Sequence, residues 1–160
     1  MPGKLLAEIG QTKPFEQIEE EAVLNITRTA DLLGQRTTEF LRTYNLTPSQ
    51  YNVLRILRGA GPDGATCSQI GERMISHDPD ITRLLDRLAN RGLILRERST
   101  EDRRVVMTAI TSEGLALLAG IDEPLRQLFH RRMGSLGRAS LETLIGQLEQ
   151  IRELFADATN

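Results

Sequence analysis

The arginine residues are the side chains whose type and spacing point to a chemical task in this sequence. Of its 20 basic residues, all but Lys4 and Lys13 are arginine, and eight arginines lie between residues 67 and 104. A guanidinium group donates hydrogen bonds in a planar fork that fits phosphates and base edges, so the pattern favours nucleic-acid binding. The codon bias of a GC-rich genome would explain the same arginine content, and the net charge of −2 adds no support.

Thr82 and Arg83 are the side chains that we expect to enter the major groove of double-stranded DNA. They follow Asp78-Pro79, a pair that predicts a helix with Asp78 as its cap and Pro79 as its first residue. Gly92 then ends this helix in the left-handed conformation. A helix fits the major groove, and its first residues reach base edges there. The apolar stripe of this helix consists of Ile81, Leu84, Leu85 and Leu88.

Further polar side chains complete the predicted interface. Asp80 could accept a hydrogen bond from a cytosine amine, and Arg87 either contacts DNA or bridges back to Asp86. Ser68 and Gln69 begin a preceding helix, where they either bind phosphate or only cap that helix. We predict DNA contacts for Ser68, Gln69, His77, Pro79, Asp80, Thr82, Arg83, Arg87, Arg103 and Arg104.

Caps and hydrophobic periods indicate the elements that must hold these side chains. Thr47-Pro48-Ser49-Gln50 and Thr66-Cys67-Ser68-Gln69 are both capping boxes that begin helices. Residues 93–98 and 104–110 read as strands, with a polar hairpin tip at 99–103. The order of helix, short helix, capped helix and hairpin is that of a winged helix-turn-helix at residues 46–111.

Long helical patterns flank this region on both sides. Apolar residues recur at steps of mostly three or four from Phe15 to Tyr44 and again after Thr111, with a break at 134–137. The first pattern is longer than a small domain needs for its own core, which indicates packing against a partner. We predict a flexible N-terminus at 1–14 and dimerisation helices at 15–45 and 112–157. The fold class is mainly α with a small β-wing, in which the N- and C-terminal helices form a dimerisation bundle.

The sequence resembles the MarR family of bacterial regulators over roughly residues 15–155. The resemblance is carried by Leu46–Tyr51, by Ile81–Leu88 followed by Arg91-Gly92-Leu93, and by the hairpin. The hairpin signature of the family is Asp-x-Arg, five residues, Leu-Thr, two residues and Gly. This chain has Asp102-Arg103-Arg104, five residues, and Ile110-Thr111-Ser112-Glu113-Gly114, with Ile110 in place of leucine.

The resemblance implies a transcriptional repressor that binds a palindromic operator as a homodimer. It implies that Arg104 lies near the minor groove and forms an ion pair with Asp102, and that Arg103 is a second contact. A solvated turn with an ordinary surface ion pair is the alternative. The resemblance further implies an unidentified small-molecule effector that changes the spacing of the two recognition helices. The pocket residues that we predict for it are Phe15, Phe40 and Tyr44.

Redox sensing by Cys67, metal binding and enzymatic catalysis have weaker support. Cys67 is the only cysteine, and the peroxide-sensing branch of the family carries its cysteine on the first long helix, where this chain has none. With His77 and His130 it makes no convincing metal site, and we predict no metal, no cofactor and no enzymatic activity. We find no signal peptide or membrane span and expect a cytoplasmic protein. The alternative function is a winged helix that binds proteins and has no affinity for DNA.

Overall fold

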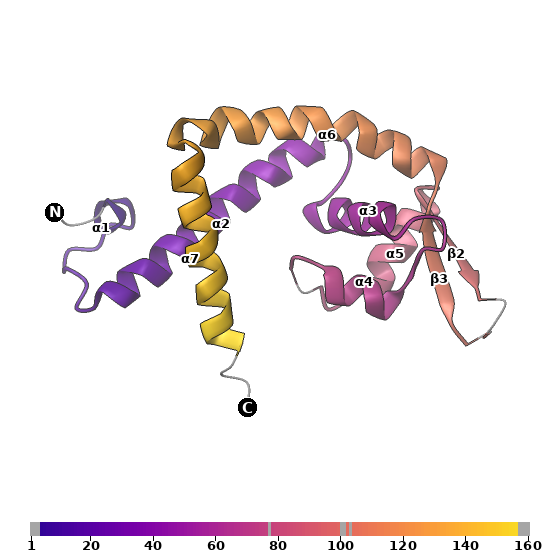
Figure 1. Cartoon of the computed structure of the whole chain (residues 1–160), viewed down its shortest axis with the longest axis horizontal. Coiled ribbons are helices and arrows are strands. Elements are labelled where there is room, and N and C mark those ends of the chain that lie inside the picture. Colours follow the sequence, from indigo (N-terminus) through magenta and orange to yellow (C-terminus); the bar gives the residue numbers. More distant parts are fainter. Residues whose placement is uncertain (1–3, 77, 100–101, 103, 157–160) are drawn as a thin grey trace. The chain divides into compact units, whose positions relative to one another are not determined.

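The computed structural model describes residues 4–76, 78–99, 102 and 104–156 of the chain. These residues form helices and a three-stranded antiparallel sheet (Figure 1), which confirms the predicted mainly α fold with a small β-wing. The chain divides into a first unit, residues 1–116, and a second unit, residues 117–160. In chain order the elements are α1 (Leu5–Glu8), α2 (Ile18–Arg42), α3 (Pro48–Ala60), β1 (Ala65–Thr66), α4 (Cys67–Arg73), α5 (Ile81–Asn90), β2 (Ile94–Arg98), β3 (Val106–Ile110), α6 (Ser112–Met133), the 3₁₀ helix η1 (Gly134–Leu136) and α7 (Arg138–Ala156).

The segment before α2 contains a helical turn that the sequence pattern does not reveal. Leu5 of α1 is buried, and it lines an apolar hollow together with Leu24 of α2. α1 has four residues, too few to display a helical period, and the flexibility of the segment 1–14 stays a prediction. α2 itself begins at Ile18 rather than at Phe15 and runs for 25 residues.

Both predicted capping boxes are present. The backbone N–H of Gln50 donates to the Thr47 hydroxyl at 3.2 Å, and the backbone N–H of Thr47 donates to Oε1 of Gln50 at 3.0 Å. The same reciprocal pair joins Thr66 and Gln69, at 3.2 Å and 2.9 Å. Each box satisfies two backbone donors that the first helical turn leaves without partners. The boxes therefore set where α3 and α4 begin.

α5 ends as its sequence predicts. Gly92 has a φ of 70°, and its N–H donates to the carbonyl of Ala89 at 2.8 Å. The N–H of Leu93 reaches back to the carbonyl of Leu88 at 3.1 Å. This pair of bonds is the Schellman motif, which needs a residue that tolerates the left-handed conformation. The chain leaves α5 directly into β2 as a result.

The sheet has the order β1-β3-β2, so β3 is its central strand. Thr108 of β3 lies opposite Ala65 of β1 and Arg96 of β2, and it is only 1% exposed. Gly64 has a φ of 70°, and a Cβ at this position would lie 2.2 Å from the carbonyl oxygen of Thr108. The sequence predicted β2 and β3 but not β1, which is two residues long.

α3 lies at the centre of the first unit, where it contacts α2, α4, α5 and β3. The core around it is aliphatic, as expected for a chain without tryptophan. Burial of such side chains is the main stabilising contribution to the unit. The buried residues are Leu41, Leu46, Val53, Leu54, Ile56, Leu57, Ile70, Leu84, Leu85, Leu88, Leu93 and Ile94.

The second unit holds most of α6, η1 and α7. The predicted break at 134–137 is confirmed, with η1 followed by Gly137 at a φ of 78°. None of the residues of α7 is buried, and Ile145 is 54% exposed although it belongs to the apolar stripe of that helix. Among the helices that the structure describes, none is both long and apolar enough to cross a membrane.

Candidate DNA-binding interface

The start of α5 differs from the prediction by two residues. The helix begins at Ile81, and its cap is Asp80, whose carboxylate accepts the backbone N–H of Arg83 at 3.4 Å. Asp78 instead accepts the backbone N–H of Asp80 at 3.0 Å, which shapes the turn before the helix. Pro79 therefore lies in that turn. The assignment of Asp78 as the cap was wrong, and the carboxylate of Asp80 has a structural role where we predicted contact with cytosine.

The exposed face of α5 carries the predicted groove residues. Thr82, Arg83 and Arg87 are exposed, whereas Leu84 and Leu85 are buried. Nε of Arg83 also lies 3.3 Å from the second carboxylate oxygen of Asp80. Its side chain nevertheless remains 73% exposed, so a base edge or phosphate could compete for it.

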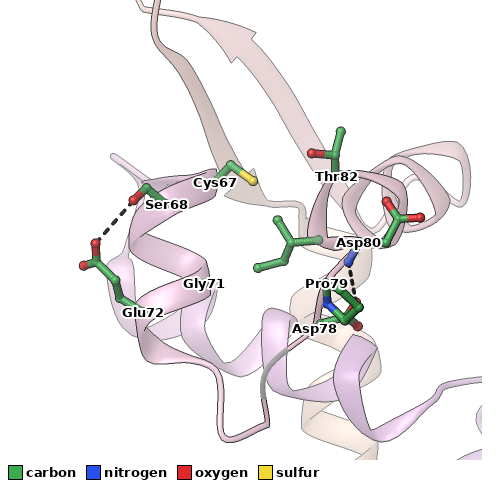
Figure 2. Close-up of a pocket in the computed structure, with 9 residues that line it drawn as sticks. Cys67, Ser68, Gly71, Glu72, Asp78, Pro79, Asp80 and Thr82 are labelled. Atoms are coloured by element: carbon green, nitrogen blue, oxygen red, sulfur yellow. Dashed lines mark hydrogen bonds between the residues drawn. The ribbon is translucent and has the colours of Figure 1, made fainter. Parts of the chain in front are cut away.

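The start of α4 lies beside the start of α5, with a shallow pocket between them (Figure 2). Cys67 and Ser68 both line this pocket, and the Ser68 hydroxyl donates to the carboxylate of Glu72 at 3.3 Å. Gln69 uses its side-chain oxygen in the capping box, which leaves its amide group to donate elsewhere. Gln69 thus has the capping role that we weighed against phosphate binding, whereas Ser68 takes no part in the capping box. The predicted DNA contacts of both residues remain predictions.

The wing places Arg104 at the end of the hairpin. Arg104 is exposed, and its backbone N–H donates to Oδ1 of Asp102 at 2.9 Å. This hydrogen bond is the contact between the two residues, in place of the ion pair between side chains that we predicted. The hydrogen bond between Arg104 and Asp102 turns the backbone at the tip of the hairpin. The predicted contacts His77 and Arg103 lie outside the described residues.

Several polar contacts hold the interface together across long sequence distances. Asp86 of α5 forms an ion pair with Arg96 of β2, not with the neighbouring Arg87. Nη1 of Arg91 donates to the carbonyl of Asn45 at 2.6 Å and so ties the end of α5 to the loop before α3. Sequence reasoning missed these contacts. The sequence did contain a signal for the Asp86–Arg96 contact. Arg96 lies two residues after the buried Ile94, so both side chains are on the inward face of the strand.

A second contact of this kind fixes the turn between α4 and α5. The side-chain oxygen of Asn52, on α3, accepts the backbone N–H of Ile75 at 2.8 Å. Ile75 itself is 83% exposed, so packing of its side chain does not hold this turn. The hydrogen bond therefore anchors the loop that leads into the recognition helix.

The three predicted effector-pocket residues do not come together in one chain. Phe40 and Tyr44 pack with ring centroids 5.4 Å apart at the end of α2. Phe15 precedes the other end of this 25-residue helix, which is about 37 Å long at 1.5 Å per residue. That these three residues border an effector pocket stays a prediction. Within the described parts of the chain, no group of three His, Cys, Asp or Glu side chains could hold a metal ion.

The winged helix and its exposed arginines define a DNA-binding protein of the winged helix-turn-helix class, and the comparisons with known proteins agree. The family model described as MarR family matches residues 46–106. The uncharacterized HTH-type transcriptional regulator YpoP of Bacillus subtilis is 36% identical over 62% of this chain and 70% of its own length. The transcriptional repressor MdtR of the same organism is 30% identical over 64% of each chain. The chain spans 60% of a further relative, the B. subtilis regulator MhqR.

A solved structure extends the match along most of the chain. The MarR transcription factor of Planctomyces limnophilus is 43% identical, with a TM-score of 0.66 over 85% of this chain and 98% of its own. The chain therefore belongs to the MarR family of DNA-binding transcriptional regulators. Its relatives are regulators and not enzymes.

Proposed function

We propose that the protein is a homodimeric repressor that binds a palindromic operator in double-stranded DNA. The observation that carries the proposal is the exposed face of α5, which presents Thr82, Arg83 and Arg87 while the opposite face is buried in the core. A helix held in this way offers its polar side chains to a major groove. Arg104 on the wing would reach the neighbouring minor groove, whose negative potential attracts arginine.

The exposed apolar surface of α7 supports the homodimer. Ile145, Leu154 and Phe155 are 54%, 74% and 69% exposed, and large side chains of this kind are normally buried. On α2, Ile18 and Leu32 are 72% and 51% exposed. A second copy that covers these helices would remove the apolar surface from water and place two recognition helices about 34 Å apart, one turn of DNA. A twofold dimer presents two recognition helices related by symmetry, so the two half-sites of its operator should form a palindrome.

The repressor role rests on likeness to MdtR, which is a repressor, and the cytoplasmic location rests on access to chromosomal DNA. We also propose an unidentified small-molecule effector near Phe40 and Tyr44, whose tilted, contacting rings and half-buried position would suit an apolar ligand. Such a ligand would act only if it bound one spacing of the recognition helices more tightly than the other.

Selection of bound duplexes from random DNA tests the central proposal. The full-length chain should enrich a palindrome whose half-sites are centred about ten base pairs apart. Its affinity for this sequence should fall steeply with added salt, because counterions are released from the phosphates. Failure to enrich any sequence at moderate salt would contradict the proposed function.

A further inference from the structure

Asp86 and Arg96 link the recognition helix α5 to the wing strand β2. Nη1 of Arg96 and Oδ1 of Asp86 form the ion pair, across the turn at Gly92. Several other ion pairs of this chain join side chains only three or four positions apart, such as Arg36–Glu39 and Arg138–Glu142. The Asp86–Arg96 pair instead joins two different elements, α5 and β2.

We propose that this ion pair positions the wing relative to the recognition helix, and thereby sets the sequence specificity of DNA binding. The inference rests on the proposed function, because it assumes that α5 and the wing contact the same operator. Neither side chain needs to touch DNA for this role. The pair acts through Thr82 and Arg83 on one side and Arg104 on the other.

The position of Asp86 on α5 connects it to the groove residues. Thr82 and Arg83 precede it by four and three residues, so all three side chains share one face of the helix. Asp86 is 54% exposed, yet its carboxylate turns toward β2. Holding this carboxylate in place therefore also holds the turn of α5 that carries the predicted base contacts.

The ladder of the hairpin connects Arg96 to the wing tip. Arg96 lies opposite Thr108, and Arg98 lies opposite Val106 at the end of the paired strands. The backbone N–H of Ser99 then donates to the carbonyl of Val105 at 2.9 Å, which brings the ladder to the residue next to Arg104. Fixing Arg96 therefore fixes the direction in which the whole hairpin leaves α5.

The burial of Arg96 argues that stability is not the main benefit of the pair. Its side chain is only 24% exposed, and its Nε is buried without a hydrogen-bond partner in the described part of the chain. Removing a guanidinium from water and leaving one N–H unpaired opposes the attraction between the charges. An apolar residue at this inward position would avoid that cost, whereas it would not hold Asp86 in one geometry.

Replacement of Asp86 separates positioning from simple electrostatics. Asp86→Asn removes a negative charge from the helix that faces the DNA phosphates, so electrostatics alone predicts tighter binding to every duplex. Positioning predicts the opposite for the operator, with little change for unrelated DNA. Glu97→Gln is the matched control, because Glu97 is exposed on the same hairpin and alternates away from the face of Arg96.

The experiment measures the affinity of the full-length chain for its selected duplex and for a scrambled duplex at fixed salt. We expect Asp86→Asn and Arg96→Gln to weaken operator binding about tenfold, which is the loss of roughly one base contact. Binding to the scrambled duplex should stay within about twofold. The double variant Asp86→Arg/Arg96→Asp should recover part of the lost specificity, and circular dichroism identifies any variant that has not folded.

Two results would overturn the inference. One is operator binding by Asp86→Asn that equals or exceeds that of the wild type, as expected for Glu97→Gln. The other is an equal loss on both duplexes in folded variants, which would indicate a general effect on DNA affinity. A wild-type chain that does not distinguish the two duplexes would instead contradict the proposed function.

Discussion

The carboxylate of Asp102 accepts the backbone N–H of Arg104 at 2.9 Å, so the acid shapes the wing tip without neutralising the arginine beside it. Backbone hydrogen bonds of this kind fix a turn, because a short acidic side chain reaches an N–H two residues along the chain. The guanidinium of Arg104 remains exposed. Asp102 therefore shapes the turn, and the proposed contact with DNA is left to Arg104, so we assign the two residues separate tasks.

Replacement of Arg104 by alanine should weaken binding to the selected operator about tenfold, because one arginine contact in the minor groove is lost. The dependence of the affinity on salt should also become shallower, since fewer counterions are released. Fluorescence anisotropy at several salt concentrations measures both quantities. Arg126→Ala is the control, because it removes an exposed arginine from the middle of α6. Equal effects of the two changes would mean that Arg104 contributes only its charge.

Asp102 provides an independent check of these separate tasks. Asp102→Ala removes the acceptor for the N–H of Arg104 and should lower operator affinity, although it also removes a negative charge. Asp102→Asn keeps an acceptor oxygen and should retain most of the affinity. If alanine and asparagine at this position gave the same affinity, the hydrogen bond would have no part in positioning Arg104.

The parts of the interface that could be predicted from sequence depend on neighbouring residues. Thr47 and Gln50 stand three residues apart, and that spacing alone specifies a capping box. Gly92 is equally informative, because few other residues tolerate its φ of 70°. Local chemistry decides these positions, and tertiary packing does not override it.

The parts that could not be predicted depend on competition or on distant contacts. Asp78 and Asp80 can both cap a helix, and the choice between them follows from the hydrogen bond from the N–H of Asp80 to Asp78. β1 consists of two residues and exists because Ala65 pairs with Thr108, more than forty residues away. Arg96 finds its partner only when α5 and β2 are packed together. No periodic pattern encodes such contacts.

Gly114 and Gly120 of α6 should respond in opposite directions to replacement by alanine. A Cβ at Gly114 would lie 2.3 Å from the carbonyl oxygen of Leu93 and 2.7 Å from Cγ1 of Ile110, whereas a Cβ at Gly120 meets no atom within 4 Å. Gly114→Ala should therefore lower the free energy of unfolding by about 3 kcal/mol. Gly120→Ala should raise it by about 0.5–1 kcal/mol, because alanine favours the helix. Urea unfolding at one protein concentration compares them, and a stable Gly114→Ala chain would contradict this packing.

Glu113 should make a small part of the stability depend on acidic pH. The pKa of Glu113 lies below its ordinary value of 4.5, because its own backbone N–H and the hydroxyls of Ser112 and Thr111 donate to the carboxylate. The folded chain thus binds this proton less readily than the unfolded chain does. The contribution is complete above about pH 4.5 and is lost as the pH falls through the lower folded pKa. The difference in unfolding midpoint between the wild type and Glu113→Gln should shrink over this range, and a constant difference would exclude this role.

Ile145 tests the proposed dimer interface. Its side chain is 54% exposed, so Ile145→Glu should leave the folded protomer intact. In a dimer, the same change would bury a charge without a partner in each copy. We expect the dissociation constant of the dimer to rise about a hundredfold or more, which corresponds to roughly 3 kcal/mol.

Light scattering over a range of concentrations measures this change in assembly. Thr143→Glu is the matched control, because Thr143 is exposed and lies on the opposite face of α7, two residues before Ile145. Operator affinity should fall together with dimerisation, since each half-site alone gains only half of the contacts. A fully dimeric Ile145→Glu chain would place the interface elsewhere, and a monomeric wild type would exclude the twofold arrangement that the palindrome requires.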